Sequence, residues 1–390
     1  MNTAETSEYK HGPEQTQWFQ LGIVCAAGFV VWSGFGAILP YLPVFLQEQA
    51  HASVWLIGIV AAAYYVGTFV FAAPLGRLSD SIGRKPVIVA GVVLYATASG
   101  LFLSTTNPWW FILFRLLEGI GAAGVTPAGQ ALIADLSTEE SRSQAYGWYT
   151  TAQFGGLVAG PLLAVPLYNL GGGEGTWAFY AIFLFGAALS AITAVVLLFT
   201  IREPEHARRR RQVKVERTSY RRLITRPVAA FFVVAFTGHF AMGVWEVIWS
   251  LWLRHLGASM SFVSWTWVAF SLPMLLSFIG GYLADRYNRW ALMFSGYLVS
   301  ALAWITYGTT TNLTLFLVVS VIEGFAVAWS TIGIAVLLFF SFCRPGPRRS
   351  VAAIPKHDLA TERPVDGRGV GQHERHPREG DVAHDGQGLG

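Results

Sequence analysis

Charged side chains are scarce in this chain of 390 residues. Asp, Glu, Lys and Arg together make up 13% of it, whereas 53% of the residues are hydrophobic. Because an average soluble domain carries about a quarter charged residues, this composition excludes an ordinary water-facing surface for most of the chain. The apolar residues form runs of about 20, the length that crosses a bilayer as a helix. The sequence therefore predicts an all-α integral membrane protein whose partners include the lipid bilayer.

Other absences argue against enzyme and metal-binding classes. Cys25 and Cys343 are the two cysteines, and the first lies inside an apolar run, which argues against a disulfide framework or a zinc site. The chain has no glycine-rich phosphate loop followed by a lysine. It also has no serine, cysteine or histidine constellation typical of nucleophilic catalysis. We therefore expect no enzyme activity, no cofactor and no bound metal.

Ten helices of spanning length can be drawn between short polar segments. Pro40 and Pro43 lie near the end of the first, where a kink would suit a helix that bends during gating, although prolines near helix ends are often merely structural. The ten are expected at residues 18–46, 54–78, 86–104, 109–134, 144–168, 177–200, 229–254, 262–284, 290–308 and 314–340.

Lysine and arginine are absent from every second connecting segment. Residues 47–53, 105–108, 169–176, 255–261 and 309–313 contain neither. The alternate segments carry Arg84, Lys85, Arg142, ten basic residues between Arg202 and Arg226, Arg286 and Arg289. Since lysine and arginine favour the cytoplasmic side of a membrane, this pattern predicts a multi-pass protein of the cell membrane with a cytoplasmic N-terminus.

Composition divides the chain into five parts. Residues 1–17 are a polar cytoplasmic segment, residues 18–200 a bundle of six helices, and residues 201–228 a basic cytoplasmic linker. Residues 229–340 hold four more helices. Residues 341–390 are too polar to cross a membrane or bury a core, and we expect them to be disordered. The basic linker is typical of an anchor at anionic headgroups, and we expect no nucleic-acid partner.

A charged turn occurs twice in the sequence. Residues 76–85 read GRLSDSIGRK, and residues 281–289, 205 positions later, read GYLADRYNR. Glycine, leucine, aspartate and arginine take the same relative positions in both. Glu118-Gly119 and Glu323-Gly324 are separated by the same 205 positions, while Ser320 stands where Arg115 would be repeated. The offset predicts two similar halves.

Four stretches resemble motifs of the major facilitator superfamily of secondary transporters. The turn at residues 76–85 is similar to its signature loop between the second and third helices. RLLEGIGAA at residues 115–123 resembles its intramembrane arginine motif, and ADLS at residues 134–137 its next cytoplasmic loop. GLVAGPLLA at residues 156–164 is similar to the Gly-Pro motif of the proton-coupled drug antiporters, although the last glycine pair of that pattern is absent here.

The resemblance implies a two-bundle architecture whose halves usually have six helices each. The second half shows four, and by the 205-residue offset the last two of the usual twelve should begin near residue 349, within the polar tail. We therefore expect about ten helices, arranged as six and four. A truncation or a change of reading frame after about residue 340 is one hypothesis, under which this particular chain transports nothing.

Several residues of the charged turn have a physical rationale. Gly76 is expected to allow close helix approach, and Gly83 to form a tight turn. Asp80 can accept from an arginine or a helix N-terminus, while Arg84 and Lys85 hold the loop at the inner face. In the repeat, Asp285 and Arg289 take the corresponding places. In the fifth helix, Gly156, Gly160 and Pro161 are candidates by the resemblance.

Ionisable residues inside apolar helices are the candidates for proton coupling. An ionised group at the centre of a membrane helix costs about 2.5–3.5 kcal/mol on insertion scales and tends to face a partner or a cavity. Glu118 and Glu323 lie about 14 Å from the outer ends of their helices, near the midplane. Arg115 lies one turn from Glu118, so the two can pair. A purely structural pair and a role in proton exchange both remain open.

The seventh helix supplies further candidates. His239 and Glu246 are seven residues apart and share a face, with Trp245 and Trp249 nearby. This pattern suits a titratable, aromatic wall for a cationic or amphipathic substrate. The alternative, slightly favoured for Glu246, places its carboxylate in water near Arg254. Gln153 of the fifth helix is a candidate for hydrogen bonding in the substrate cavity.

Together these patterns predict a secondary transporter of small molecules by alternating access. By the resemblance, proton-coupled efflux of amphipathic compounds is favoured, with protons as partners. Uptake of a sugar or an organic anion is the alternative within the class.

Overall fold

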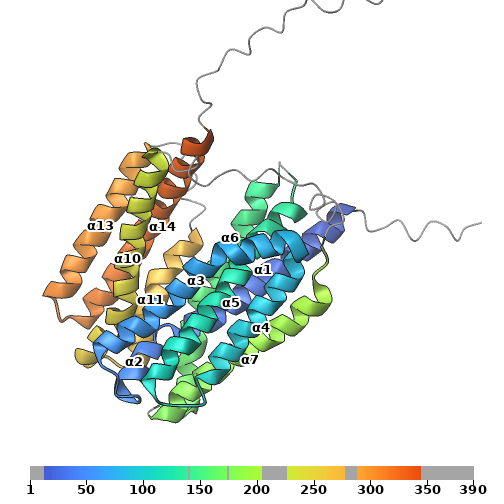
Figure 1. Cartoon of the computed structure of the whole chain (residues 1–390). Helices are drawn as coiled ribbons and strands as arrows, with labels where there is room; N and C mark the ends of the chain where they lie inside the picture. The colour runs from blue at the N-terminus through green and yellow to red at the C-terminus, as the bar shows by residue number, and fades with distance from the viewer. Residues whose placement is uncertain (1–12, 139–140, 174, 204–225, 277–287, 344–390) are drawn as a thin grey trace, which may run out of the picture. The chain divides into compact units, whose positions relative to one another are not determined.

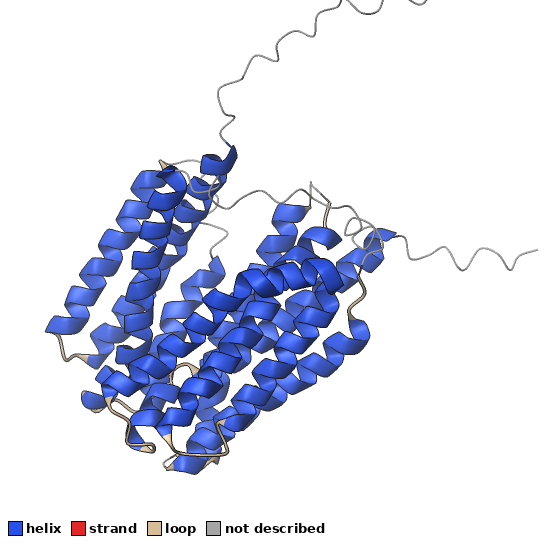
Figure 2. Ribbon diagram, in the orientation of Figure 1, coloured by secondary structure: helices blue, strands red, loops and turns tan. Residues whose placement is uncertain are grey.

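The structure is a computed structural model that describes residues 13–138, 141–173, 175–203, 226–276 and 288–343. All of these residues belong to one compact unit, Met1–Cys343. They are helical throughout apart from turns and short connections (Figures 1 and 2). The expected tail and most of the expected linker lie outside the described residues.

The first half contains α1 (Pro13–Ile38), α2 (Leu42–Glu48), α3 (Val54–Ile82), α4 (Arg84–Leu101), α5 (Pro108–Leu136), α6 (Arg142–Leu170) and α7 (Thr176–Thr200). The second half contains α10 (Arg226–His255), α11 (Met260–Ser271), the 3₁₀ turn η1 (Leu272–Leu276), α13 (Arg289–Thr309) and α14 (Leu313–Cys343). Each of the ten expected helices thus has a counterpart among the described residues.

Two of the expected helices are interrupted at prolines. The first ends at Ile38 and resumes as α2 after a turn that contains Pro40. The eighth was expected to run unbroken to residue 284, but α11 ends at Ser271 and η1 follows. Pro273 lacks the N–H that an α-helical turn uses and lies in η1. Proline alone does not explain the change, because Pro74, Pro127, Pro161 and Pro166 lie inside uninterrupted α-helices.

Three helices begin at capping side chains. The hydroxyl of Ser53 accepts from the backbone N–H of Leu56 at the start of α3, and Asn107 caps α5 by accepting from Trp109. Ser259 repeats this arrangement at the start of α11 by accepting from Phe262. These caps satisfy N–H groups that would otherwise lack a partner.

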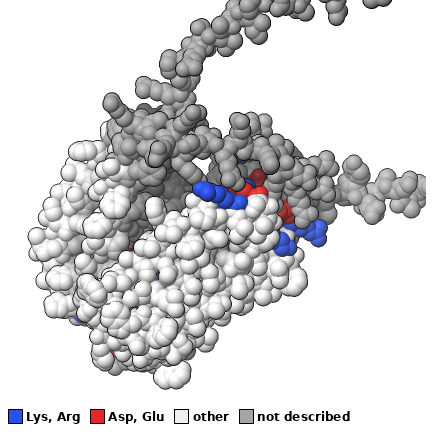
Figure 3. Space-filling view, viewed as in Figure 1, with Lys and Arg blue, Asp and Glu red and all other residues white. Residues whose placement is uncertain are grey.

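Six described helical segments are long and apolar enough to cross a membrane: Trp18–Glu48, Val54–Ile82, Pro108–Leu136, Arg142–Leu170, Thr176–Thr200 and Ala291–Thr309. Their outward faces carry large apolar side chains, among them Phe69 and Phe199, which are 83% and 77% exposed. In Figure 3 most of the visible described surface is uncharged, and charged side chains gather at one end. Such a surface suits hydrocarbon as its solvent.

Glycines bring pairs of helices into backbone contact in the first half. A Cβ atom added to Gly156 of α6 would lie 2.3 Å from the carbonyl oxygen of Phe29 in α1, and one added to Gly160 would lie 2.5 Å from the backbone of Ala37. The stretch that resembles the Gly-Pro motif is therefore the contact line between α6 and α1. Pro161, also buried, lies at the same contact.

The same device occurs at matching positions of the two halves. A Cβ atom added to Gly119 of α5 would lie 2.1 Å from the carbonyl oxygen of Tyr64 in α3. One added to Gly324 of α14 would lie 2.1 Å from the carbonyl oxygen of Phe270 in α11. Each of these glycines directly follows one of the two glutamates, Glu118 and Glu323, that are 205 positions apart. The repeat predicted from the sequence therefore extends to helix packing.

The two halves meet in two places: α11 and η1 pack against α6, and α10 packs against α2 and α3. Val247 and Leu251 of α10 pack into the same apolar core as Tyr41 and Phe45. In addition, Ser264 of α11 donates a hydrogen bond to the Tyr41 hydroxyl at 2.9 Å. This contact holds the two halves together beside the charged site described next.

Candidate functional site

Arg115 of α5 is the centre of a buried charge cluster. Its side chain is 2% exposed, and its Nη1 donates to Oε2 of Glu118 at 2.9 Å. Ser99 of α4 donates to the other oxygen of Glu118 at 2.5 Å. The pairing expected from their spacing of three residues is therefore confirmed. The cluster satisfies a carboxylate that would otherwise be strongly disfavoured inside a membrane protein.

The cluster continues into the second half of the chain. Nη2 of Arg115 lies 3.6 Å from Oε1 of Glu246 in α10, and the hydroxyl of Tyr65 in α3 donates to Oε2 of the same carboxylate. One guanidinium therefore faces two carboxylates, one from each half. Its planar, forked donors suit such a double contact.

The structure corrects the expectation that Glu246 lies in water near Arg254. Glu246 is 5% exposed, and Arg254 instead pairs with Glu48 of α2 at 2.8 Å. The physical reason is the apposition of α10 with the first half, which offers Glu246 a cation and a hydroxyl in place of water. The second charged contact between the halves is thus Glu48–Arg254.

Two further features surround Arg115. Its Cζ atom lies 4.5 Å from the ring centroid of Tyr64, a cation–π distance. A cavity of about 20 Å³ is lined by Arg115, Glu246 and neighbouring apolar residues of α1, α2 and α3. Since about 10–15 Å³ of such space holds one water molecule, there is room for about one water beside the ion pair.

Glu323 of α14 occupies the matching place in the second half, with different partners. Trp304 donates to its Oε1 at 2.6 Å, and the hydroxyl of Tyr307 donates to its Oε2 at 3.0 Å. Ser320, which stands where Arg115 would be repeated, lies 3.4 Å from the same tyrosine hydroxyl. The ion pairs of the described residues include none to Glu323. Neutral donors therefore replace the cation in this half.

The other predicted site residues are packed elsewhere in the molecule or lie outside the described residues. Trp245 and Trp249 are buried in the apolar core of the second half, where their rings stack on each other at 5.3 Å. Both rings pack in this apolar cluster, and their place in a substrate wall stays a prediction. Gln153 is partly buried on α6, near Gly28 of α1. The side chains of His239 and Arg289, and all of Asp285, lie outside the described residues.

The charged turn closes between α3 and α4. Gly83 adopts a φ of 125°, so the predicted tight turn is present and needs a glycine. Asp80 pairs with Arg84, whose Nε also lies 3.4 Å from Asp135 at the end of α5. The backbone N–H of Lys85 donates to Glu203 at 2.6 Å. The turn thus joins α3, α4, α5 and the end of α7.

The close helix approach expected at Gly76 is not made to any described residue. A Cβ atom added there would meet nothing within 4 Å among the described residues, so this glycine makes no close helix approach to them. The close approaches in α3 are made nearer its middle. Gly67, for example, would place a Cβ atom 2.6 Å from the carbonyl oxygen of Leu116.

Sequence reasoning missed the hydroxyl partners of the carboxylates. Tyr65 and Ser99 carry no motif, and their roles depend on which helices become neighbours. A signal for one of them was nevertheless available. Ser99 precedes Glu118 by 19 residues and Trp304 precedes Glu323 by 19, so the 205-residue offset pairs the two donors as it pairs the two acids.

Asp80→Asn is expected to leave stability nearly unchanged. The Asp80 side chain is 64% exposed, and an ion pair of this kind contributes about 0–1 kcal/mol. We therefore expect thermal unfolding of the detergent-solubilised variant to match wild type. Transport by the same variant in vesicles should fall, if the turn controls helix movement. Full transport activity in this variant would remove Asp80 from the mechanism.

The chain matches known proteins along most of its length. The model of the Major Facilitator Superfamily matches residues 24–352. The chain is 26% identical over 227 residues to Multidrug resistance protein 1 of Bacillus subtilis (strain 168), a match that covers 58% of this chain and 56% of that protein. It is 32% identical over 226 residues to Tetracycline resistance protein, class E, of Escherichia coli, covering 54% and 53%.

These matched regions span about half the length of the curated relatives. Among solved structures, the fold is similar to that of a bacterial homologue of the human lysosomal transporter Spinster, in an inward-facing and unoccupied conformation. The TM-score is 0.63 at 18% identity, and the match covers 83% of this chain and 79% of that one.

Proposed function

Because this chain belongs to the Major Facilitator Superfamily, we propose that it moves small solutes across a membrane by alternating access, exporting amphipathic compounds in exchange for protons. The drug and tetracycline resistance proteins among its relatives support the efflux direction. The absence of basic residues from alternate loops supports a cytoplasmic N-terminus. Alternating access requires contacts between two bundles that form in one state and break in another.

The buried pair of Arg115 and Glu246 is the observation that carries this proposal. It joins the two halves at 3.6 Å, and both side chains are almost completely buried. An ion pair in such a place is strong while both charges are present and costly when one is lost. The pair therefore makes the contact between the halves depend on the charge of Glu246.

A proton that reaches Glu246 would weaken this contact. Protonation cancels the carboxylate charge and with it the attraction to Arg115, while the Tyr65 hydroxyl can still hydrogen-bond to the carboxyl group. The space beside the pair can hold one water molecule, which would be a proton donor in direct reach of the carboxylate. Arg115 then keeps Glu118 as its remaining partner. In this proposal, protonation of Glu246 releases α10 from the first half.

Glu323 and Glu118 take different parts in the proposal. Glu118 is held by both Arg115 and Ser99, which suits a residue that positions the guanidinium. Glu323 is held by neutral donors, which suits a second carboxyl group that can bind and release a proton without breaking an ion pair. His239 remains a candidate on α10 on sequence grounds alone.

Glu246→Gln is expected to disconnect transport from the proton gradient. Glutamine keeps the size and the hydrogen bond to Tyr65 but imitates the protonated acid at every pH. Loss of a buried charge pair worth about 3 kcal/mol corresponds to about a 100-fold fall in gradient-driven transport. The measurement is tetracycline movement in proteoliposomes with an imposed pH gradient, with and without an ionophore.

Glu48→Gln is the matched control for this experiment. Glu48 also pairs across the halves, with Arg254, but its side chain is 32% exposed. We expect it to retain most of the gradient-driven transport. Equal dependence on the gradient in wild type and Glu246→Gln would contradict the role of Glu246. Absence of gradient-driven transport by wild type, or uptake of sugars or organic anions in its place, would contradict the proposed efflux.

A further inference from the structure

An open groove runs along the outer surface of the first half between α4 and α7. The two helices pack against each other and lie side by side in Figure 1. Every residue that lines the groove belongs to one of them, and the volume of the groove is about 510 Å³. This volume is within the range of about 300–1,000 Å³ that small-molecule sites occupy.

The groove has a floor of small side chains between walls of larger ones. Ala96 of α4 and Ala194 of α7 are buried and form the floor. Val93, Leu184 and Val195 form the walls, with 48–57% of their surface exposed. The hollow therefore follows from the order of small and large side chains along the two helices.

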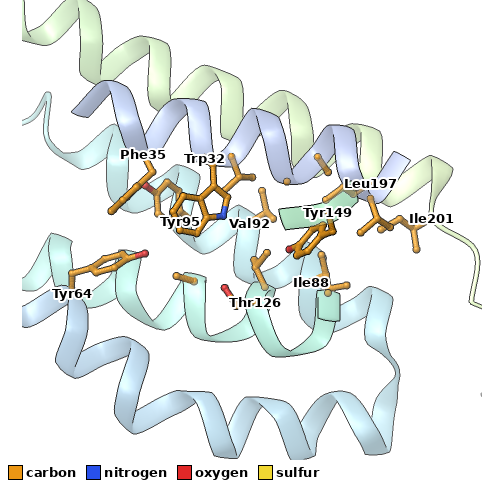
Figure 4. A pocket seen from close by; sticks show the side chains of 17 residues that line it. Trp32, Phe35, Tyr64, Ile88, Val92, Tyr95, Thr126, Tyr149, Leu197 and Ile201 are labelled. Carbon is orange, nitrogen blue, oxygen red and sulfur yellow. The ribbon is translucent and has the colours of Figure 1, made fainter. Parts of the chain in front are cut away.

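The groove lies on the outside of the first half and is separate from its interior. Ile88 and Val92 of α4 and Leu197 of α7 line a small interior cavity instead (Figure 4). Val89 and Val93 each come one position later on α4, which turns their side chains by about 100° around the helix. The groove therefore opens to the uncharged surface that suits hydrocarbon, and its occupant would come from the bilayer.

The chemistry of the lining is aliphatic apart from Thr97. The Thr97 hydroxyl donates to the backbone carbonyl of Val93 at 2.8 Å, so its hydrogen bond is made within α4. A charged or strongly hydrogen-bonding group without partners would be disfavoured in such a place. The part of a ligand that lies in the groove is therefore a hydrocarbon.

The dimensions of the groove suit one hydrocarbon chain. Its lining extends over eight residues of α4 and fourteen of α7, about 12 and 21 Å along the helix axes. These lengths bracket the depth of one leaflet, which is about 15 Å of a hydrocarbon core of about 30 Å. The volume spread over them gives a cross-section of about 25–40 Å². Because a helix about 10 Å across needs about 80 Å², the groove suits a single acyl chain rather than a helix.

Two cations stand at one end of the groove. Lys85 lies one turn before Val89 on the same face of α4. Arg202 is exposed and lies four residues beyond Leu198, just after the end of α7. The ion pairs of the described residues include none to Lys85 or Arg202. Glu203 is the acidic neighbour, and its carboxylate accepts from the backbone N–H of Lys85. Since lysine and arginine near a membrane surface attract anionic headgroups, this end favours a phosphate.

We propose that the groove between α4 and α7 binds one acyl chain of an anionic phospholipid, whose phosphate is held by Lys85 and Arg202. The opposite ends of the two helices adjoin residues 105–108 and 169–176, which contain neither lysine nor arginine. The charges therefore give the lipid its direction in the groove. The site shares no residue with the charge cluster around Arg115, so it goes beyond the proposed function and stands independently of the solute.

Native mass spectrometry of the full chain in detergent tests the site, with phosphatidylglycerol as the probe. We expect wild type to bind one molecule with a distinctly higher affinity than any further one. Ala191→Trp should lose this first binding, because Ala191 lines the groove and an indole ring would fill it. Thr97→Trp should have the same effect from the side of α4. Ile192→Trp is the matched control and should bind as wild type does, since Ile192 is 60% exposed on α7 outside the groove.

The headgroup is tested by a variant that combines Lys85→Gln with Arg202→Gln. At about a fivefold effect for each basic residue, this variant should bind phosphatidylglycerol about 30-fold more weakly than wild type. Its preference over phosphatidylcholine with the same acyl chains should disappear. Arg254→Gln is the control for loss of a cation, because Arg254 pairs with Glu48 near the start of α3, whereas Lys85 follows the end of α3.

Three results would overturn the site. The first is binding that survives both Ala191→Trp and Thr97→Trp, or that Ile192→Trp removes equally. The second is equal affinity of wild type for phosphatidylglycerol and phosphatidylcholine. The third is a dimer of the lipid-free protein that Ala191→Trp dissociates, which would assign the groove to a second copy of the chain. Thermal unfolding of each variant establishes that it is folded.

Discussion

Replacing Arg115 with glutamine will abolish transport and lower the free energy of unfolding by about 3–5 kcal/mol, the usual cost of breaking a buried ion pair. The guanidinium lies 2.9 Å from Glu118 and 3.6 Å from Glu246, all three side chains being buried. Without it, two carboxylates lose their cation and become stable only by taking up protons. The contact between the halves then no longer depends on the proton gradient.

Unfolding in mixed detergent micelles and transport in proteoliposomes measure the two effects. Arg115→Lys should recover part of the stability, because it restores the charge, but little of the transport. An ammonium lacks the forked donors that face both carboxylates at once. Arg254→Gln is the control for removal of a cation from the contact between the halves, since the Arg254 side chain is 33% exposed. We expect it to cost about 0–1 kcal/mol.

A double-mutant cycle of Arg115→Gln and Glu246→Gln tests the pairing itself. Residues in direct contact show coupling energies of about 0.5–3 kcal/mol. A coupling near zero, with both single variants destabilised, would show that the residues act separately. It would also remove the observation that carries the proposed function.

Replacing Gly119 with alanine is the second large effect that we expect. The added methyl group would lie 2.1 Å from the carbonyl oxygen of Tyr64, a distance that the backbones of α3 and α5 can relieve only by moving apart. Overpacking of this kind costs about 1–3 kcal/mol and sometimes more. Such a shift would also move Arg115 and Glu118, which lie within four residues on the same helix. Stability and transport should therefore fall together.

Gly58→Ala is the matched control for Gly119→Ala. Both glycines lie within long helices of the first half, but a Cβ atom at Gly58 would meet nothing within 4 Å among the described residues. There the change should be neutral or slightly stabilising, because alanine is the better helix former by about 1 kcal/mol. Gly324→Ala, at the repeated position, should resemble Gly119→Ala. If Gly119→Ala unfolds at the same temperature as Gly58→Ala, α3 and α5 do not pack as closely at Gly119 as described here.

Local patterns predicted much of the architecture. The length of each apolar run is a property of consecutive residues, so helices such as α7 were expected within a residue of their observed bounds. The turn at Gly83 and the break at Pro40 follow from the conformational limits of glycine and proline. The eighth helix was expected to run without a break to residue 284, because its apolar pattern continues past Pro273. The structure instead has a 3₁₀ turn at that proline.

The candidate site could be predicted in part. Arg115 and Glu118 were recognised as a pair because residues three apart on a helix are neighbours. The partner of Glu246 could not be recognised in this way, since Arg115 and Tyr65 are more than 100 positions away along the chain. Sequence proximity pointed to Arg254 instead, which is eight residues away and faces Glu48.

The amino-acid order alone specified a helical membrane protein with a repeated charged turn, and it marked Glu118 and Glu323 as related positions. These properties depend on hydrophobic length, on charge in short loops and on residue spacing within one helix. The pairing of Glu246 with Arg115 and the neutral donors around Glu323 emerged only from the folded arrangement. Each depends on which helices lie side by side in space, and the order of residues along the chain does not reveal that.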